Sequence, residues 1–222
     1  MIRAISVAAR AAAVVLCLIV VLCPLAAQAA DYKVDGSRLT ISGTFYGDRE
    51  FDDFTTMVRK DPAIKTIVMK QFYGGVNMSN SLSFPKFIRE SGLATEVDGP
   101  CFSACATAFV GGVRRGLAPT ADPNKTVVGF HGAYQAGRVY EPFEITYVNA
   151  IRRYTGGRMS EAMIRRAYHL PQDGFLAFFD PRRGTNEKGQ SVFVCTGKEK
   201  RQVADCEALA GIDGFKTGVF TH

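Results

Sequence analysis

The sequence has few of the side chains that bind transition metals. Histidine occurs only three times in 222 residues. The chain has no Cys-x-x-Cys pair, and no histidine lies close to a cysteine along it. A structural zinc site needs four such ligands at characteristic spacing. We therefore predict no metal site, and we expect no other cofactor.

The sequence also lacks internal repeats, low-complexity tracts and blocks of like charge. Gly and Pro fall singly between periodic segments, so no linker divides the chain. When the first 30 residues and their two arginines are set aside, 25 basic residues face 21 acidic ones, a net charge of +4. This charge is too weak to predict nucleic-acid binding. The prediction is one domain over residues 31–222.

The first 30 residues are typical of a cleavable secretory signal peptide. Arg3 and Arg10 lead into an uncharged apolar run, and residues 27–29 form Ala-Gln-Ala, a small-x-small cleavage signal. Cleavage there would leave Ala30 or Asp31 at the N-terminus. The alternative is a retained membrane anchor, but a proline and several small residues shorten the strongly apolar part. We predict a periplasmic or secreted protein with no membrane span after cleavage.

Four cysteines remain in the predicted mature chain: Cys101, Cys105, Cys195 and Cys206. An oxidising compartment preserves disulfides, and four cysteines allow three pairings. Cys195 ends an apolar strand-like run and Cys206 lies in a helix-like segment, so the short loop between them favours a Cys195 to Cys206 bond. We interpret Cys101 and Cys105 as buried small residues or a local staple, with a redox or thiol site as the alternative.

Apolar periodicity predicts alternating strands and helices along the mature chain. The predicted strands cover residues 38–43, 65–71, 93–97, 126–130 and 191–195. The predicted helices cover residues 50–60, part of 77–90, 103–110, 143–154 and 159–168. Such alternation is typical of an α/β fold.

Three local features indicate a possible acyl-transfer site. They are the Gly74-Gly75 pair after a strand, the run 101–106 at a strand-to-helix turn, and His131 at a strand end. A serine at the first turn of a helix lies beside unpaired backbone N–H groups, and a Gly-Gly loop exposes its own. Two converging donors would form an oxyanion hole, and a histidine is the usual general base.

Each of these features also has an ordinary structural interpretation. Ser103 is a common residue type for a helix N-cap, and Gly74-Gly75 for a turn. His131 at the end of a strand could simply be hydrogen-bonded. The functional interpretation therefore depends on the order of the features rather than on any one of them.

In that order the sequence resembles the Clp-type serine peptidase branch of the Clp/crotonase superfamily, in particular its small exported members, from about residue 65 to residue 173. Such proteins have a Gly-Gly oxyanion loop after a strand, then a nucleophile turn like Cys101-Phe102-Ser103-Ala104-Cys105-Ala106, then a strand end like Gly129-Phe130-His131. The resemblance implies an α/β spiral of repeated β-β-α units, a peptide or ester substrate, and trimers or stacked rings.

The resemblance also implies a role for each matching residue. Ser103 would be the nucleophile, His131 the general base, and the backbone N–H groups of Gly75 and Ala104 the oxyanion donors. The acid of the triad would be Asp173 or its competitor Asp180.

The sequence departs from the family in two places. Residues 71–73 are Gln-Phe-Tyr where the peptidases usually have Ser-Pro before the glycines. Pro85 lies inside the next predicted helix, so we expect that helix to start there or to be kinked. Two function classes stay open: an exported serine hydrolase, most simply a peptidase, and a non-catalytic exported binding or scaffold protein that keeps the fold.

Overall fold

The computed structural model describes most of the chain beyond the predicted signal peptide. The described residues are 30–45, 47–73, 78–182, 189–199 and 203–222. Within these ranges, no helix is long and apolar enough to cross a membrane.

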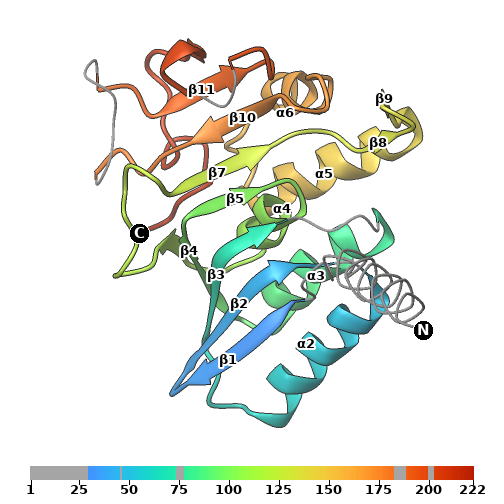
Figure 1. Cartoon of the computed structure of the whole chain (residues 1–222), viewed down its shortest axis with the longest axis vertical. Helices are drawn as coiled ribbons and strands as arrows, with labels where there is room; N and C mark the ends of the chain where they lie inside the picture. Colours follow the sequence, from blue (N-terminus) through green and yellow to red (C-terminus); the bar gives the residue numbers. More distant parts are fainter. Residues whose placement is uncertain (1–29, 46, 74–77, 183–188, 200–202) are drawn as a thin grey trace, which may run out of the picture.

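One mixed sheet of ten strands runs through the described residues (Figure 1). Its main path is β1 (Asp31–Asp35), β2 (Arg38–Thr44), β3 (Thr66–Tyr73), β5 (Pro100–Phe102), β7 (Val127–Phe130), β10 (Phe175–Phe178), β11 (Val192–Cys195) and β12 (Glu207–Ala208). A side branch of β4 (Ala94–Asp98) and β6 (Arg115–Leu117) leaves the path at β3. The middle strands β2, β3, β5 and β7 are parallel, whereas β1, β10, β11 and β12 each pair antiparallel.

The middle of the chain repeats a β-β-α unit. The first unit is β4, β5 and helix α4 (Ala104–Val110), and the second is β6, β7 and, after a hairpin, helix α5 (Glu144–Tyr154). The first strands of the two units pair in parallel on the side branch, and the second strands pair in parallel in the main sheet. Successive units therefore stack as turns of a spiral. The predicted α/β fold class is confirmed.

The remaining helices cover the sheet. They are α2 (Asp48–Lys60), α3 (Met78–Glu90), α6 (Glu161–Tyr168) and the short 3-10 turns η1 (Glu141–Phe143) and η2 (Val203–Asp205). A small separate hairpin consists of β8 (Tyr134–Gln135) and β9 (Arg138–Val139). Helices α2 and α3 lie next to the β1 to β3 end of the sheet, where the rings of Phe54 and Phe84 meet at 4.4 Å (Figure 1).

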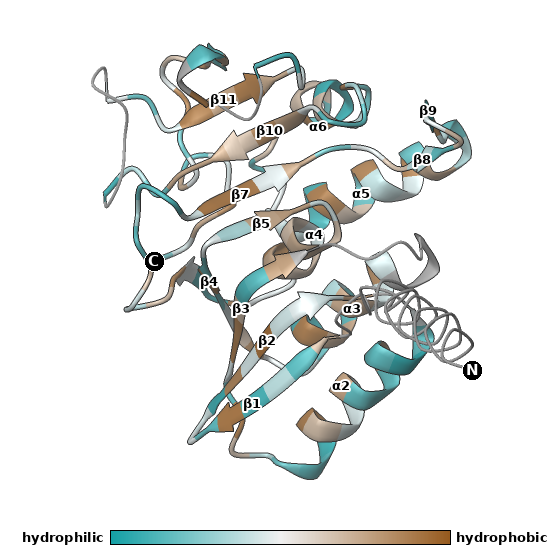
Figure 2. Ribbon diagram, viewed as in Figure 1, coloured by the Kyte–Doolittle hydropathy of each residue, from teal (hydrophilic) through white to brown (hydrophobic). Residues whose placement is uncertain are grey.

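Apolar side chains form a large core between the sheet and the helices and a smaller cluster at its β11 end. The large core extends from Leu39 to Phe220. The smaller cluster contains Val127, Phe193 and the cysteines of the Cys195–Cys206 disulfide. In Figure 2, β11 is coloured hydrophobic, while the outer face of α2 is hydrophilic. This division is the amphipathic pattern from which the helices were predicted.

The end of the chain returns to the side branch of the sheet. The buried guanidinium of Arg115 donates hydrogen bonds to the carbonyl oxygens of Gly112, Gly218 and Val219. The Arg115 carbonyl accepts from Thr221 N–H at 3.0 Å. These contacts place the C-terminus beside β6 (Figure 1).

The predicted strands correspond to β2, β3, β4, β7 and β11, and the predicted helices to α2 to α6. Helix α3 does not start at Pro85 but includes it as an internal residue, so the kinked helix is the alternative that stays a prediction. One local expectation was wrong: Cys206 lies between η2 and β12 rather than in a helix, because residues 203–205 form only one 3-10 turn.

Candidate active site

The sheet register brings Ser103 next to the strand that carries His131. Strands β5 and β7 are parallel, with Phe102 opposite Gly129. The Ser103 N–H donates to the Gly129 carbonyl at 3.0 Å, which extends the pairing by one residue. His131 directly follows β7. Two residues far apart in the sequence therefore lie at the same end of neighbouring strands.

The backbone of Ser103 has an unusual conformation. Its φ of 59° and ψ of −124° lie in a region that non-glycine residues rarely adopt. Ser103 occupies the N-cap position of α4, yet its side chain makes no capping hydrogen bond. The ordinary N-cap interpretation therefore does not describe this residue. A serine on a strained strand-to-helix turn has its hydroxyl directed outward, as in nucleophile elbows of other hydrolase folds.

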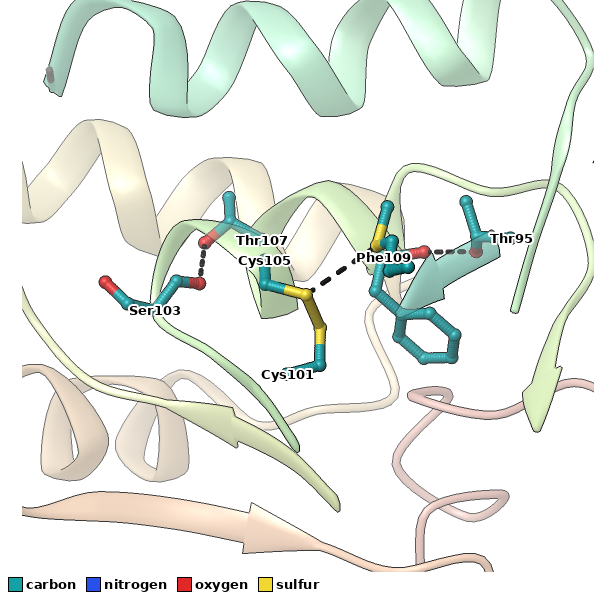
Figure 3. The surroundings of a disulfide bond; sticks show 7 residues. Thr95, Cys101, Ser103, Cys105, Thr107 and Phe109 are labelled. Atoms are coloured by element: carbon teal, nitrogen blue, oxygen red, sulfur yellow. Dashed lines mark hydrogen bonds between the residues drawn. A yellow bond between two sulfur atoms is a disulfide. The ribbon is translucent and has the colours of Figure 1, made fainter. Parts of the chain in front are cut away.

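The carbonyl of Ser103 is held by the helix that follows. The Thr107 N–H donates to the Ser103 carbonyl at 3.1 Å, and the Thr107 hydroxyl donates to the same oxygen at 3.2 Å. Figure 3 shows this contact and shows the Ser103 side chain directed away from the Cys101–Cys105 disulfide. The N–H of Ala104 has no hydrogen-bond partner among the described residues. It remains available as the donor predicted for it.

The two cysteines that flank Ser103 and the Phe102 ring pack in different apolar clusters. Cys101 and Cys105 are fully buried in the large core and bonded to each other, so the local-staple interpretation is confirmed and neither sulfur is a free thiol. The Phe102 ring packs with the smaller cluster, 4.7 Å from the ring of Phe175. A Cβ at Gly129 would lie 2.2 Å from this ring, which explains the glycine. Ser103 itself is partly exposed.

His131 is a partly buried residue, and its ring nitrogen Nδ1 is buried without a partner. Its Nδ1 has no hydrogen bond among the described residues, which the hydrogen-bonded interpretation did not anticipate. Burial lowers the pKa of His131 to about 4, although the negative charge of Asp173 acts in the opposite direction. The imidazole is therefore neutral at pH 7, the form in which it can accept a proton. Between Ser103 and His131, both described, no hydrogen bond is formed.

The sheet register also separates the two candidate acids. Leu176 of β10 lies opposite Phe130 of β7, so the residues before β10 approach His131. Asp173 is an exposed residue at that end, and its charge acts on the imidazole. Asp180 lies beyond the opposite end of β10 and is buried in an ion pair with Arg182 at 3.1 Å. The structure thus brings Asp173, and not Asp180, to His131.

Tyr134 is a site residue that the sequence did not reveal. Its ring stacks on the His131 ring at a centroid distance of 5.4 Å and an angle of 22°. Its hydroxyl donates to the Leu170 carbonyl at 2.6 Å, in the loop that carries Asp173. Tyr134 thus connects the imidazole to the acid-bearing loop. The available signal was Ala136-Gly137, whose positive φ values form the turn of the β8–β9 hairpin.

A further close contact fixes the position of this loop. A Cβ at Gly132 would lie 2.1 Å from the Tyr168 carbonyl oxygen, so only glycine lets the chain after His131 pass the end of α6.

The other predicted oxyanion donor, Gly75, lies outside the described residues.

The described residues contain no group of three or more His, Cys, Asp or Glu side chains placed to hold a metal ion. They do line a cavity of about 280 Å³ at β2, β3 and residues 118–120, whose lining includes neither Ser103 nor His131. The charged groups of this cavity are paired: Arg38 with Glu96, and Lys70 with Asp98.

No protein-family model matches the chain, and no curated protein matches its sequence. Among solved structures, it is similar to a putative enoyl-CoA hydratase from Streptomyces avermitilis, with a TM-score of 0.40 and 11% identity over 64% of this chain and 61% of that one. A probable enoyl-CoA hydratase from Mycobacterium tuberculosis gives 0.40 and 14% over 68% of each chain. A membrane-bound stomatin-specific protease gives 0.38 and 14% over 56% of this chain and 67% of that one.

The similarity to these structures is limited. The chain spans about half of the length of one solved hydratase structure from Acinetobacter baumannii and about three fifths of the Streptomyces avermitilis one. At these identities and TM-scores the similarity concerns the fold alone, and the case for a function depends on the site.

Proposed function

We propose that this chain is an exported serine hydrolase of the peptidase class that forms an acyl-enzyme on Ser103, with His131 as its general base. The observation that carries the proposal is the backbone of Ser103. A non-glycine residue at a φ of 59° is strained, and its hydroxyl makes no capping bond that would explain its position. Such strain concentrates at functional sites, where the surrounding structure holds it.

The neighbouring groups supply the other parts of an acyl-transfer site. His131 is neutral because burial lowers its pKa to about 4. Its buried Nδ1 lacks a partner, and the carboxylate that acts on it is Asp173. A modest approach of this exposed side chain would give Nδ1 its acceptor and raise the basicity of the ring. Catalytic hydrogen bonds are often long in the absence of substrate and shorten when it binds.

In the proposed reaction, Ser103 Oγ attacks the carbonyl carbon of the substrate while His131 accepts the hydroxyl proton. The carbonyl oxygen becomes negative and is stabilised by the Ala104 N–H and, we propose, by that of Gly75. His131 then gives the proton to the leaving amine or alcohol as its bond to carbon breaks, which leaves an ester on Ser103. Water attacks this ester and gives a proton to His131, which passes it to Ser103 Oγ as the acid departs.

Export is part of the same proposal. Two disulfides fit an oxidising compartment, and residues 27–29 form the cleavage signal described above. We propose a periplasmic or secreted protein whose domain covers residues 31–222. The mature chain should begin at Ala30 or Asp31, and intact-mass measurement of exported protein decides this. Retention of residues 1–29 would contradict the proposal of cleavage.

A fluorophosphonate probe tests the proposed activity because it reacts with activated serines. We expect it to label the mature protein on the peptide that contains Ser103. Ser103→Ala should remove the label, whereas Ser160→Ala should keep it, because Ser160 caps α6 through a hydrogen bond from Met163 N–H. Labelling that survives in Ser103→Ala would show that another residue is the nucleophile.

One observation favours the second candidate, a non-catalytic binding or scaffold protein. No hydrogen bond joins Ser103 to His131, and His131 Nδ1 has no partner among the described residues. If a panel of esters, peptides and serine probes leaves the folded protein unchanged, this candidate replaces the hydrolase.

A further inference from the structure

We infer that the Cys101–Cys105 disulfide is a positioning element of the proposed nucleophile turn, which holds Ser103 in the backbone conformation that its reaction needs. The inference rests on the proposed function, since it concerns how the same serine is presented. It assigns a role to a bond that the sequence allowed only as a local staple.

The disulfide encloses the turn completely. Cys101 is the middle residue of β5, Cys105 is the second residue of α4, and Ser103 is midway between them. The bonded residues are only four positions apart, with their Cα atoms separated by 5.2 Å. The strand, the strained residue and the start of the helix therefore form one small covalent ring.

The turn needs such a restraint because its conformation is unfavourable by itself. Ser103 has a positive φ without being glycine, and its side chain forms no cap that would stabilise the helix start. The helix that follows has only seven residues, too few to be stable on its own. Without external restraints, the chain would relax to an ordinary cap conformation and redirect the hydroxyl.

Three restraints act on this turn, and the disulfide is the covalent one. On the strand side, Ser103 N–H bonds to the Gly129 carbonyl at 3.0 Å. On the helix side, Thr107 donates twice to the Ser103 carbonyl. The disulfide lies beneath the turn in the large core, where both cysteines are fully buried. Figure 3 shows two of these restraints, the disulfide and the contact of Thr107 with the Ser103 carbonyl.

The second disulfide provides a matched control. Cys195–Cys206 also joins a strand to a short segment after it, and both of its cysteines are buried, but it lies in the smaller cluster beneath the Phe102 ring and encloses no residue of the turn. Removing either bond with two alanine substitutions makes the same chemical change. The two variants therefore differ in which part of the structure loses its restraint.

The experiment compares fluorophosphonate inactivation of wild type, Cys101→Ala/Cys105→Ala and Cys195→Ala/Cys206→Ala. We expect the first variant to lose at least tenfold in the maximal inactivation rate constant, with little change in the probe concentration for half-maximal rate. The control should stay within about twofold of wild type. Equal rates in all three proteins, or equal losses in both variants, would overturn the inference, because a purely stabilising bond gives no selective effect on the chemical step.

Hydrogen exchange of the amides of residues 103–107 provides a measurement that does not require reactivity. These amides should exchange faster in Cys101→Ala/Cys105→Ala than in the control variant. If wild type does not react with the probe, the proposed function fails. If exchange at these amides is the same in both variants, the disulfide does not restrain the turn, whether or not the protein is a hydrolase. Should the double variant not fold, Cys105→Ala alone takes its place, since it breaks the bond and keeps the Cys101 side chain.

Discussion

The two disulfides of this protein are the same bond in two different settings. Cys195–Cys206 closes an eleven-residue separation beside the smaller apolar cluster, where it ties the η2 segment to an antiparallel strand. Cys101–Cys105 closes a four-residue separation around Ser103, whose backbone is strained at a strand-to-helix turn. The first setting is explained by stability. The second is explained, on the inference above, mainly by the geometry of Ser103, because its shorter loop restrains less of the unfolded chain.

The largest effect on activity should come from replacing Ser103 in the turn or His131 on the neighbouring strand. Ser103→Ala and His131→Ala should each reduce hydrolysis by about 10⁴-fold or more, and the double variant should lose little beyond either one, because such residues act as a unit. Ser103→Ala should leave the free energy of unfolding within about 0.5 kcal/mol of wild type, since its hydroxyl makes no capping bond. Steady-state kinetics and urea unfolding test both parts. Additive losses would mean that the two residues do not act together.

Replacing the two candidate acids should separate an effect on activity, at Asp173, from an effect on stability, at Asp180. Asp173→Asn should lower kcat/KM by up to about 10⁴-fold but by less than Ser103→Ala, because an orienting acid does not touch the substrate. Asp180→Asn should instead cost about 2 kcal/mol of stability while the folded protein keeps its activity, because the buried Asp180 carboxylate loses its charge-assisted hydrogen bonds from the half-exposed Arg182 guanidinium. Exchanged outcomes for these variants would show that Asp180 is the functional acid.

Burial of His131 should make stability depend on pH. The pKa of His131 is about 4 in the folded protein and about 6.5 in an unfolded chain, so between these values the unfolded state binds the proton more strongly. The contribution is complete above pH 6.5 and is lost as the pH falls towards 4, on the order of 3 kcal/mol. Urea unfolding at pH 7 and pH 4 should show this loss in wild type.

The same loss should be absent in His131→Gln, which does not titrate, whereas His222 is common to both proteins. The acid limb of kcat/KM should correspondingly lie near pH 4 rather than near 6.5, because kcat/KM reports the free enzyme. Equal pH dependence of stability in wild type and His131→Gln would contradict the burial of this imidazole.

The smallest effect should be the stability difference between the two disulfides. Loop-closure entropy predicts a loss of about 3 kcal/mol without Cys195–Cys206 and about 2 kcal/mol without Cys101–Cys105. Removing Cys195–Cys206 should therefore cost more stability, whereas removing Cys101–Cys105 should cost more reactivity at Ser103. Calorimetric or urea unfolding of the two double alanine variants measures it. A larger stability loss from the Cys101–Cys105 pair would favour a mainly structural role for that bond.

Long periodic segments were predictable from the sequence, because a helix such as α5 repeats its apolar residues every three or four positions. Strands β5, β6 and β10 were not, because each has only three or four residues and none has the valines that mark the equally short strands β7 and β11. The Cys195 to Cys206 pairing was predicted correctly from its short loop.

Most of the candidate site was identified from local motifs, but its arrangement was not. The choice between Asp173 and Asp180 depends on the antiparallel register of β10 on β7, which no local pattern encodes. Tyr134 was missed for a similar reason, because its contact with the 170–173 loop spans 36 residues. The strain at Ser103 is likewise a product of the tertiary structure, since it is held by Gly129 and Thr107.

The most direct test of the central claim is to trap the acyl-enzyme. Mature protein would be mixed with an activated ester, such as a p-nitrophenyl ester, quenched in acid within the first turnover, and examined by intact mass and peptide mapping. The account predicts one acyl group per chain on the peptide that contains Ser103, and none in Ser103→Ala. Steady turnover of the ester with no adduct, or with the adduct on another residue, would contradict it.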